Sequence, residues 1–229
     1  MAGVAATVAL GFWQLGRADY KEALQNRITE LARQPPLAIG AQEMKLEDVL
    51  LRRVELRGKF DASRAVFLDN HVYKHQAGFY VVMPLKLAGG EKHVLVNRGW
   101  IAAGRERTRA PQVKTPFGEV VIRGLAVAPA ERFIELSGKT AEGNIWQNLV
   151  LERYRQAAKL DVQPFIVQQA EGDRPLDDGL VRWWPPVDLK RNTHLAYAVQ
   201  WFALAAAIFI YYVVINVRNR RPASRPAAT

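Results

Sequence analysis

The chain has 229 residues and carries 32 Lys and Arg against 22 Asp and Glu, a formal net charge of +10. These positive charges are scattered among acidic residues and form no basic run with interleaved aromatics, so we expect no nucleic-acid binding. The absence of cysteine excludes disulfides, thiol nucleophiles, Cys-ligated zinc and iron–sulfur clusters. The length suffices for one medium domain together with membrane-spanning segments.

The N-terminal stretch is apolar to about Leu15 and is short for a complete membrane span. A cleaved signal peptide is the alternative, but the stretch has no basic beginning, and residues 13–15 make a poor cleavage site. We therefore expect a first transmembrane helix over residues 1–16, truncated at its beginning. A polar helix with a narrow apolar stripe follows and continues to Arg33, where two prolines end it.

The middle of the chain changes to the two-residue periodicity of β-strands. The third and fourth predicted strands flank a Gly89-Gly90 turn and should form an antiparallel hairpin, and Pro84 indicates an edge or a bulge in the third. Half-buried strands that close on themselves favour a barrel-like or sandwich-like domain. The predicted strands are residues 54–60, 65–68, 78–87, 93–101, 118–128 and 164–169, with a linker at 34–46 and a helix at 149–159.

A second apolar run lies near the C-terminus. From Leu195 to Ile215 no residue is charged, and at about 1.5 Å per residue the run reaches roughly 30 Å, the thickness of a bilayer's hydrocarbon core. The basic tail that follows, residues 217–229, marks the cytoplasmic side. We therefore predict a second transmembrane helix at 194–216, and both termini in the cytoplasm.

The predicted fold class is accordingly α+β, with two transmembrane helices bracketing one external, mainly antiparallel β-rich domain. That domain covers residues 17–193 and is expected in the periplasm of a bacterium. Its positive charge does not oppose this orientation, because long loops are translocated largely regardless of charge.

The sequence contains no catalytic constellation. It has no Gly-x-Ser-x-Gly motif and no glycine-rich phosphate loop between a strand and a helix. His71 and His75 flank a predicted turn and are expected to be exposed loop residues rather than a metal pair, and His93 is expected on the surface of a strand. Asp177 and Asp178 are adjacent carboxylates in a loop-rich region. We therefore expect the chain not to be an enzyme.

His194 differs from the other histidines because it stands at the outer mouth of the predicted second span. On a helix it shares a face with Tyr197 and with Gln200 or Trp201, and Gln200 lies roughly 9 Å below it along the axis. Gln200 needs a polar partner at that depth, which Gln14, a cofactor or another membrane protein can supply. Neutral imidazole is a common axial haem ligand, and a histidine that bonds water and headgroups is the alternative.

Several segments, taken in chain order between the two spans, resemble the Surfeit-locus-one family of cytochrome c oxidase assembly proteins. The first-helix motif, the first strand, the central hairpin, a later loop and the closing motif all have a counterpart. The matching segments are Leu10-Gly11-Phe12-Trp13-Gln14-Leu15-Gly16-Arg17, Arg52-Arg53-Val54-x-Leu-x-Gly58-x-Phe60, Gly78-Phe79 through Pro84-Leu85, Val94-Leu95-Val96-Asn97-Arg98-Gly99-Trp100, Asn144-x-Trp146, and Asn192-Thr193-His194 through Ala205.

The resemblance implies an assembly factor in the bacterial inner membrane that binds haem a and assists its insertion into oxidase subunit I. Haem a synthase is a further implied partner. In that family the histidine that opens the second span is the proposed ligand of haem iron, and it matches His194. The cofactor-binding residues that follow are His194, Tyr197, Gln200, Trp201 and Gln14.

The resemblance also leaves a second function open. The alternative is a haem-free structural chaperone that stabilises an assembly intermediate of subunit I. For the haem-binding function, Arg98 and Arg17 are candidate partners of the haem propionates.

Overall fold

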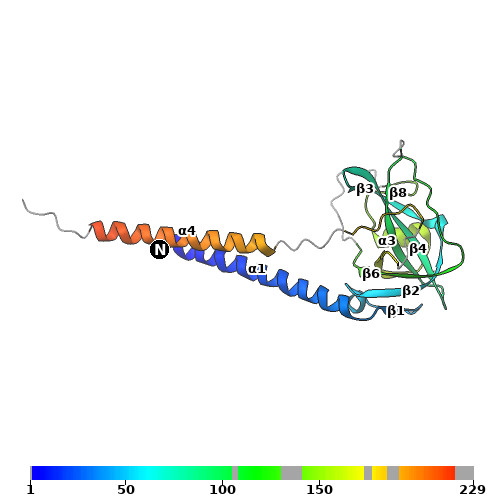
Figure 1. The fold of residues 1–229 in the computed structure, drawn as a ribbon, viewed down its shortest axis with the longest axis horizontal. Coiled ribbons are helices and arrows are strands. Elements are labelled where there is room, and N and C mark those ends of the chain that lie inside the picture. The colour runs from blue at the N-terminus through cyan, green and yellow to red at the C-terminus, as the bar shows by residue number, and fades with distance from the viewer. Residues whose placement is uncertain (1, 105–107, 130–140, 173–176, 185–190, 220–229) are drawn as a thin grey trace, which may run out of the picture. The chain divides into compact units, whose positions relative to one another are not determined.

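The computed structural model describes residues 2–104, 108–129, 141–172, 177–184 and 191–219 (Figure 1). The chain divides into two compact units. One combines Met1–Arg27 with Pro186–Thr229, and its described part is helical. The other, Ile28–Pro185, is rich in β-strands.

The helical unit pairs the first part of α1, Ala2–Arg33, with α4, Arg191–Asn219. The rings of Phe12 and Phe202 meet edge to face with centroids 5.4 Å apart. Gln14, further along α1, contacts His194, which comes earlier on α4. The two helices therefore run antiparallel (Figure 1).

Small side chains form the contact between these two helices. Gly11 is buried against the ring of Phe202, and a Cβ at Gly11 would lie 2.6 Å from that ring. Small residues let helix backbones approach closely, as is common for helix pairs in membranes. The buried residues of the pair are Thr7, Gly11 and Ala18 on α1 and Ala198 and Ala205 on α4.

Among the described residues, the helix Asn192–Arg218 is the one that is long and apolar enough to cross a membrane. Only 11% of its apolar window is buried, whereas the core helix of a soluble protein would be mostly covered. α4 thus agrees with the span predicted at 194–216. α1 runs without a break through the polar stretch to Arg33, and its early part does not meet the same test. Most of the predicted tail at 217–229 lies outside the described residues.

A closed five-stranded barrel organises the second unit, in the order β2-β6-β9-β5-β4. β4 pairs back with β2 and closes the ring. All neighbours are antiparallel except β5 and β9, which are parallel. This confirms the barrel-like, mainly antiparallel prediction. The barrel strands are β2 Arg53–Phe60, β4 Gln76–Leu87, β5 His93–Ala102, β6 Glu119–Val127 and β9 Val162–Gln169.

Short elements extend and cover the barrel. β1 pairs in parallel with β2, and β3 pairs with β4, followed by β8 and β7. The predicted linker at 34–46 therefore contains a strand that the sequence pattern did not indicate. These elements are β1 Leu37–Ile39, α2 Leu46–Val49, the 3-10 turn η1 Ala62–Arg64, β3 Val66–Tyr73, β7 Ala141–Glu142, β8 Ile145–Trp146 and α3 Leu151–Ala158.

The unit has two apolar layers. One fills the barrel with side chains such as Leu56, Phe79 and Phe165. The other lies outside the ring, where Trp146 of β8 and Tyr154 of α3 belong to a cluster with side chains of β4, β5 and β9. β5 is therefore covered on both faces over most of its length.

The double cover of β5 corrects the prediction for His93. This residue is 7% exposed rather than at the surface. Burial lowers the pKa of its imidazole, and the backbone of Asp161 opposes that change. The alternating pattern of β5 was predicted correctly, but the face of the strand that was expected to be exposed to solvent is covered by the outer apolar layer.

Pro84 lies in a central strand, so the prediction of an edge is wrong. The pairing of β4 with β3 ends at Val82, and its pairing with β2 begins at Leu85. Pro84 thus stands where β4 changes partner, which is a place that tolerates a residue without an N–H. The predicted bulge is confirmed nearby, because the register with β5 shifts between Val81 and Val82.

Candidate functional site

His194 and Gln14 form a polar contact inside the helix pair. His194 lies in the first turn of α4, and its Nδ1 is 2.7 Å from Oε1 of Gln14 on α1. Both side chains are half-buried. The sequence indicated both residues as site candidates and suggested that Gln14 is a partner of Gln200. In the structure, Gln14 contacts His194 instead.

This contact determines which nitrogen of His194 can bind a ligand. An amide oxygen only accepts hydrogen bonds, so Nδ1 of His194 carries the proton and donates it to Gln14. In the neutral ring the lone pair is then on Nε2. Histidines that ligate metals usually donate their other ring N–H to an acceptor in this way, which fixes the tautomer and the ring orientation.

The other predicted site residues divide between two sides of α4. Trp201 is half-buried, two turns below His194. Tyr197 is 49% exposed and Gln200 is exposed, so both lie outside the contact with α1. The helix pair therefore brings His194 and Gln14 together, with Trp201 half-buried two turns away, and leaves Tyr197 and Gln200 on a surface that can meet a ligand or a partner.

One imidazole suits haem better than a free metal ion. The described residues contain no group of three or more His, Cys, Asp or Glu side chains that could hold a metal ion. A porphyrin supplies four nitrogen ligands of its own, so haem iron needs only an axial ligand from the protein. The chemistry of this single, oriented histidine is consistent with that requirement.

A second polar cluster lies in the β-rich unit and was not predicted. Asp178 accepts a hydrogen bond from Arg98 at 3.1 Å and also pairs with Arg182. The side chains of both arginines are 1% exposed. Burial lowers the pKa of Arg98, and the Asp178 carboxylate opposes that change. Arg98, which the sequence suggested as a propionate partner, thus already has a buried counter-ion.

His71 also differs from its predicted setting. It belongs to β3 rather than to a loop, and its ring packs on Tyr80 with centroids 4.3 Å apart. Burial lowers the pKa of its imidazole, although Asp69 opposes the effect. His75, in the adjoining turn, is exposed as predicted.

Comparison with known proteins gives consistent matches over most of the chain. The model of the SURF1 family matches residues 1–206. A SURF1-like protein of Rickettsia prowazekii is 27% identical over 218 residues, covering 93% of this chain and 86% of the relative. Surfeit locus protein 1 of Takifugu rubripes is 26% identical, covering 89% of each chain. The human protein of that name is 26% identical, covering 86% of this chain and 70% of its own.

Proposed function

Because the chain belongs to the SURF1 family, we propose that it is a membrane-bound assembly factor for cytochrome c oxidase that binds haem a and assists its insertion into subunit I. Family membership supports an assembly role in general terms, and one long apolar helix is consistent with a membrane protein. The haem cargo, subunit I and haem a synthase as partners, and a non-enzymatic role are parts of the proposal.

The contact between His194 and Gln14 is the observation that carries the haem proposal. It fixes the orientation of the imidazole at the end of the apolar span and, in the neutral ring, leaves the lone pair on Nε2. Nε2 would ligate the iron of haem a, and Trp201, Tyr197 and Gln200 would contact the macrocycle or the receiving subunit. One axial ligand on an exposed helix suits a carrier, because cargo held by a single protein ligand can be exchanged.

The proposed topology follows from the same residues. α4 crosses the inner membrane, and the apolar beginning of α1 crosses beside it, so both termini are cytoplasmic. The β-rich unit would then lie in the periplasm. His194 and Gln14 would lie at the periplasmic end of the helix pair, where polar side chains can reach the interface.

The test is the absorption spectrum of the full-length protein purified in detergent from cells that make haem a. We expect a Soret band in the wild type and its loss or displacement in His194→Ala. Gln14→Leu should retain the ligand atom but lower haem affinity by about 10–100-fold, the usual effect of removing an outer-shell partner. His75→Ala, which removes an exposed histidine, is the matched control and should bind as the wild type does.

Two results would contradict the proposal. A Soret band unchanged in His194→Ala would remove the ligand assignment. A colourless wild type that still co-purifies with subunit I would favour the haem-free structural chaperone, in which the β-rich unit contacts the assembly intermediate.

A further inference from the structure

Half of one edge of β6 has no neighbouring strand among the described residues. On one side, β2 pairs with β6 from Glu119 to Leu125. On the other side, β9 pairs only with Gly124–Val127, because β9 ends at Gln169. Beyond Gln169 the second half of β5 pairs with Val181 through Trp100, whereas the first half of β6 has no neighbour on this side among the described residues, which leaves an opening along β6.

The register shows which backbone groups this opening leaves unpaired. Ala126 donates its N–H to Arg52 on the β2 side, whereas Arg123 accepts from Ala170 on the β9 side. Hydrogen-bonded positions alternate along an antiparallel strand, so the odd-numbered residues of β6 face the β9 side. The N–H and C=O of Val121 therefore point into the opening.

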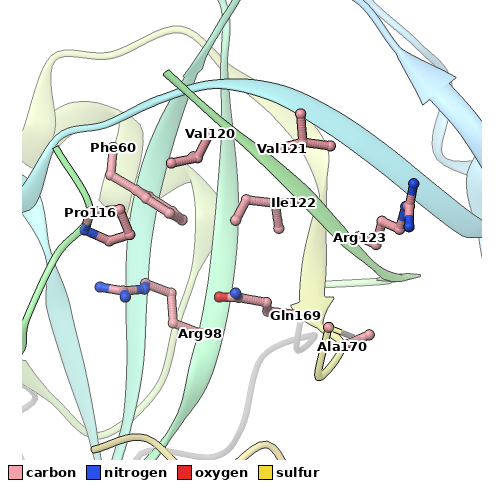
Figure 2. A pocket seen from close by; sticks show the side chains of 10 residues that line it. Phe60, Arg98, Pro116, Val120, Val121, Ile122, Arg123, Gln169 and Ala170 are labelled. Carbon is pink, nitrogen blue, oxygen red and sulfur yellow. The ribbon is translucent and has the colours of Figure 1, made fainter. Parts of the chain in front are cut away.

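A cavity of about 460 Å³ occupies the same place. Figure 2 shows Val120 and Ile122 along one side of it and Arg98 and Gln169 on the other. Nε of Arg98 and Oε1 of Gln169 are both buried and have no hydrogen-bond partner in the described structure. The two residues are 0% and 3% exposed. An unpaired donor and an unpaired acceptor thus face one largely apolar cavity.

Exposed apolar side chains adjoin the opening. Phe117, which follows the cavity-lining Pro116, is 98% exposed, and Val121 is 49% exposed. Large apolar side chains exposed beside a groove are typical of a surface that binds another protein.

We propose that this opening is a docking site for an extended segment of a partner polypeptide, which adds to β6 as a strand. The main chain of the segment would pair with Val121, and its next peptide group would accept from Nε of Arg98 and donate to Oε1 of Gln169. An apolar side chain of the segment would fill the space beside Phe60 and Ile122. Such strand addition takes its affinity from main-chain hydrogen bonds and its specificity from the pockets beside them.

The chemistry of the opening favours a peptide over other ligands. An anion would meet the oxygen of Gln169, and Arg98 already pairs with the carboxylate of Asp178. A buried water could satisfy the two side chains, but it would not pair with the edge of β6. A peptide segment supplies a donor and an acceptor at both places. This site does not depend on haem binding by His194.

The test uses the full-length protein in detergent and a blocked hexapeptide, acetyl-Thr-Val-Thr-Val-Thr-Val-amide, with amide hydrogen exchange followed by NMR. We expect the peptide to slow exchange at Val121 and to shift the Nε–H resonance of Arg98. The same peptide N-methylated at every residue keeps its side chains but cannot donate main-chain hydrogen bonds, and it should not bind.

Variants of the chain separate the edge from the cavity. Val121→Pro removes the N–H that points into the opening and none of the N–H groups that pair with β2, and Gln169→Leu removes the unpaired acceptor. Each should weaken hexapeptide binding by at least about tenfold, the effect of losing one well-formed hydrogen bond. Val121→Thr keeps the N–H and is the matched control. Circular dichroism checks that each variant is folded.

Three outcomes would overturn the proposal. One is slow exchange at Val121 without peptide, because the edge would then already be covered by this chain. The second is an absence of peptide-dependent protection at millimolar hexapeptide. The third is equal binding by wild type, Val121→Pro and Gln169→Leu.

Discussion

Replacing Asp178 by Asn should strongly destabilise the β-rich unit. The substitution keeps the shape of the side chain but removes the only carboxylate that pairs with Arg98 and Arg182 in the described structure. Both arginine side chains are 1% exposed, so water cannot replace the lost charge. Removing one partner of a buried ion pair costs about 3–5 kcal/mol. For a unit of this size each kcal/mol lowers Tm by about 2–4 °C, which gives a fall of about 6–20 °C.

The assay is thermal unfolding of the full-length protein in detergent, followed by near-UV circular dichroism. Asp177→Asn is the matched control, because that neighbouring carboxylate is 99% exposed and its ion pair is with the exposed Lys114. Its Tm should stay within about 2 °C of the wild type, as expected for a surface ion pair. If the Tm of Asp178→Asn also stays within about 2 °C of the wild type, the Asp178 carboxylate is not required to stabilise the two buried arginines.

Three further substitutions probe the barrel in the same unfolding assay. Gly58→Ala should lower the free energy of unfolding by about 1–3 kcal/mol, because the added Cβ would lie within 3 Å of a main-chain oxygen of β4 and overpack the barrel. Gly40→Ala is the control and should leave the free energy of unfolding unchanged, because the space around Gly40 is open. Equal effects of the two substitutions would contradict this prediction. Tyr154→Phe should cost about 1 kcal/mol, because the buried hydroxyl donates to a main-chain oxygen of η1 at 2.8 Å. Burial lowers the pKa of His93 below its ordinary value of 6.5. As the pH falls, His93 is therefore protonated in the unfolded chain at a higher pH than in the folded protein, and the free energy of unfolding should decrease below about pH 6.5. His93→Gln should reduce that slope between pH 7 and 5, and an unchanged slope would assign the effect elsewhere.

Local periodicity predicted most strands of the barrel, including the hairpin of β4 and β5. It failed where burial or pairing depends on distant parts of the chain. β1 was missed because three residues are too few to show an alternation. His93 was placed at the surface because nothing near it in sequence shows that α3 and β8 cover the outer face. The position of β9 between β5 and β6 is likewise a long-range pairing that no local pattern encodes.

The candidate site was predictable to the extent that helix geometry determines it. The length of the apolar run placed His194 at the end of α4, and the motif around Gln14 placed that residue on α1. The direct bond between them needed the packing of the two helices, in which Gly11 admits the ring of Phe202. The cluster around Asp178 was missed because Arg98 is eighty residues away, and an acidic residue beside another in a loop gives no sign of burial.

The place of β9 in the ring also constrains how the chain is made. β5 and β6 are synthesised before β9, yet each finds its partner on that side only when residues 162–169 are available. Until then two strands present open edges that can pair with other chains. A nascent chain that ends before Val162 should therefore be protease-sensitive and prone to aggregate, whereas one that extends past Gln169 should resist digestion. The barrel therefore closes late in biosynthesis. A chaperone that covers the open strand edges would be needed most before residues 162–169 are synthesised.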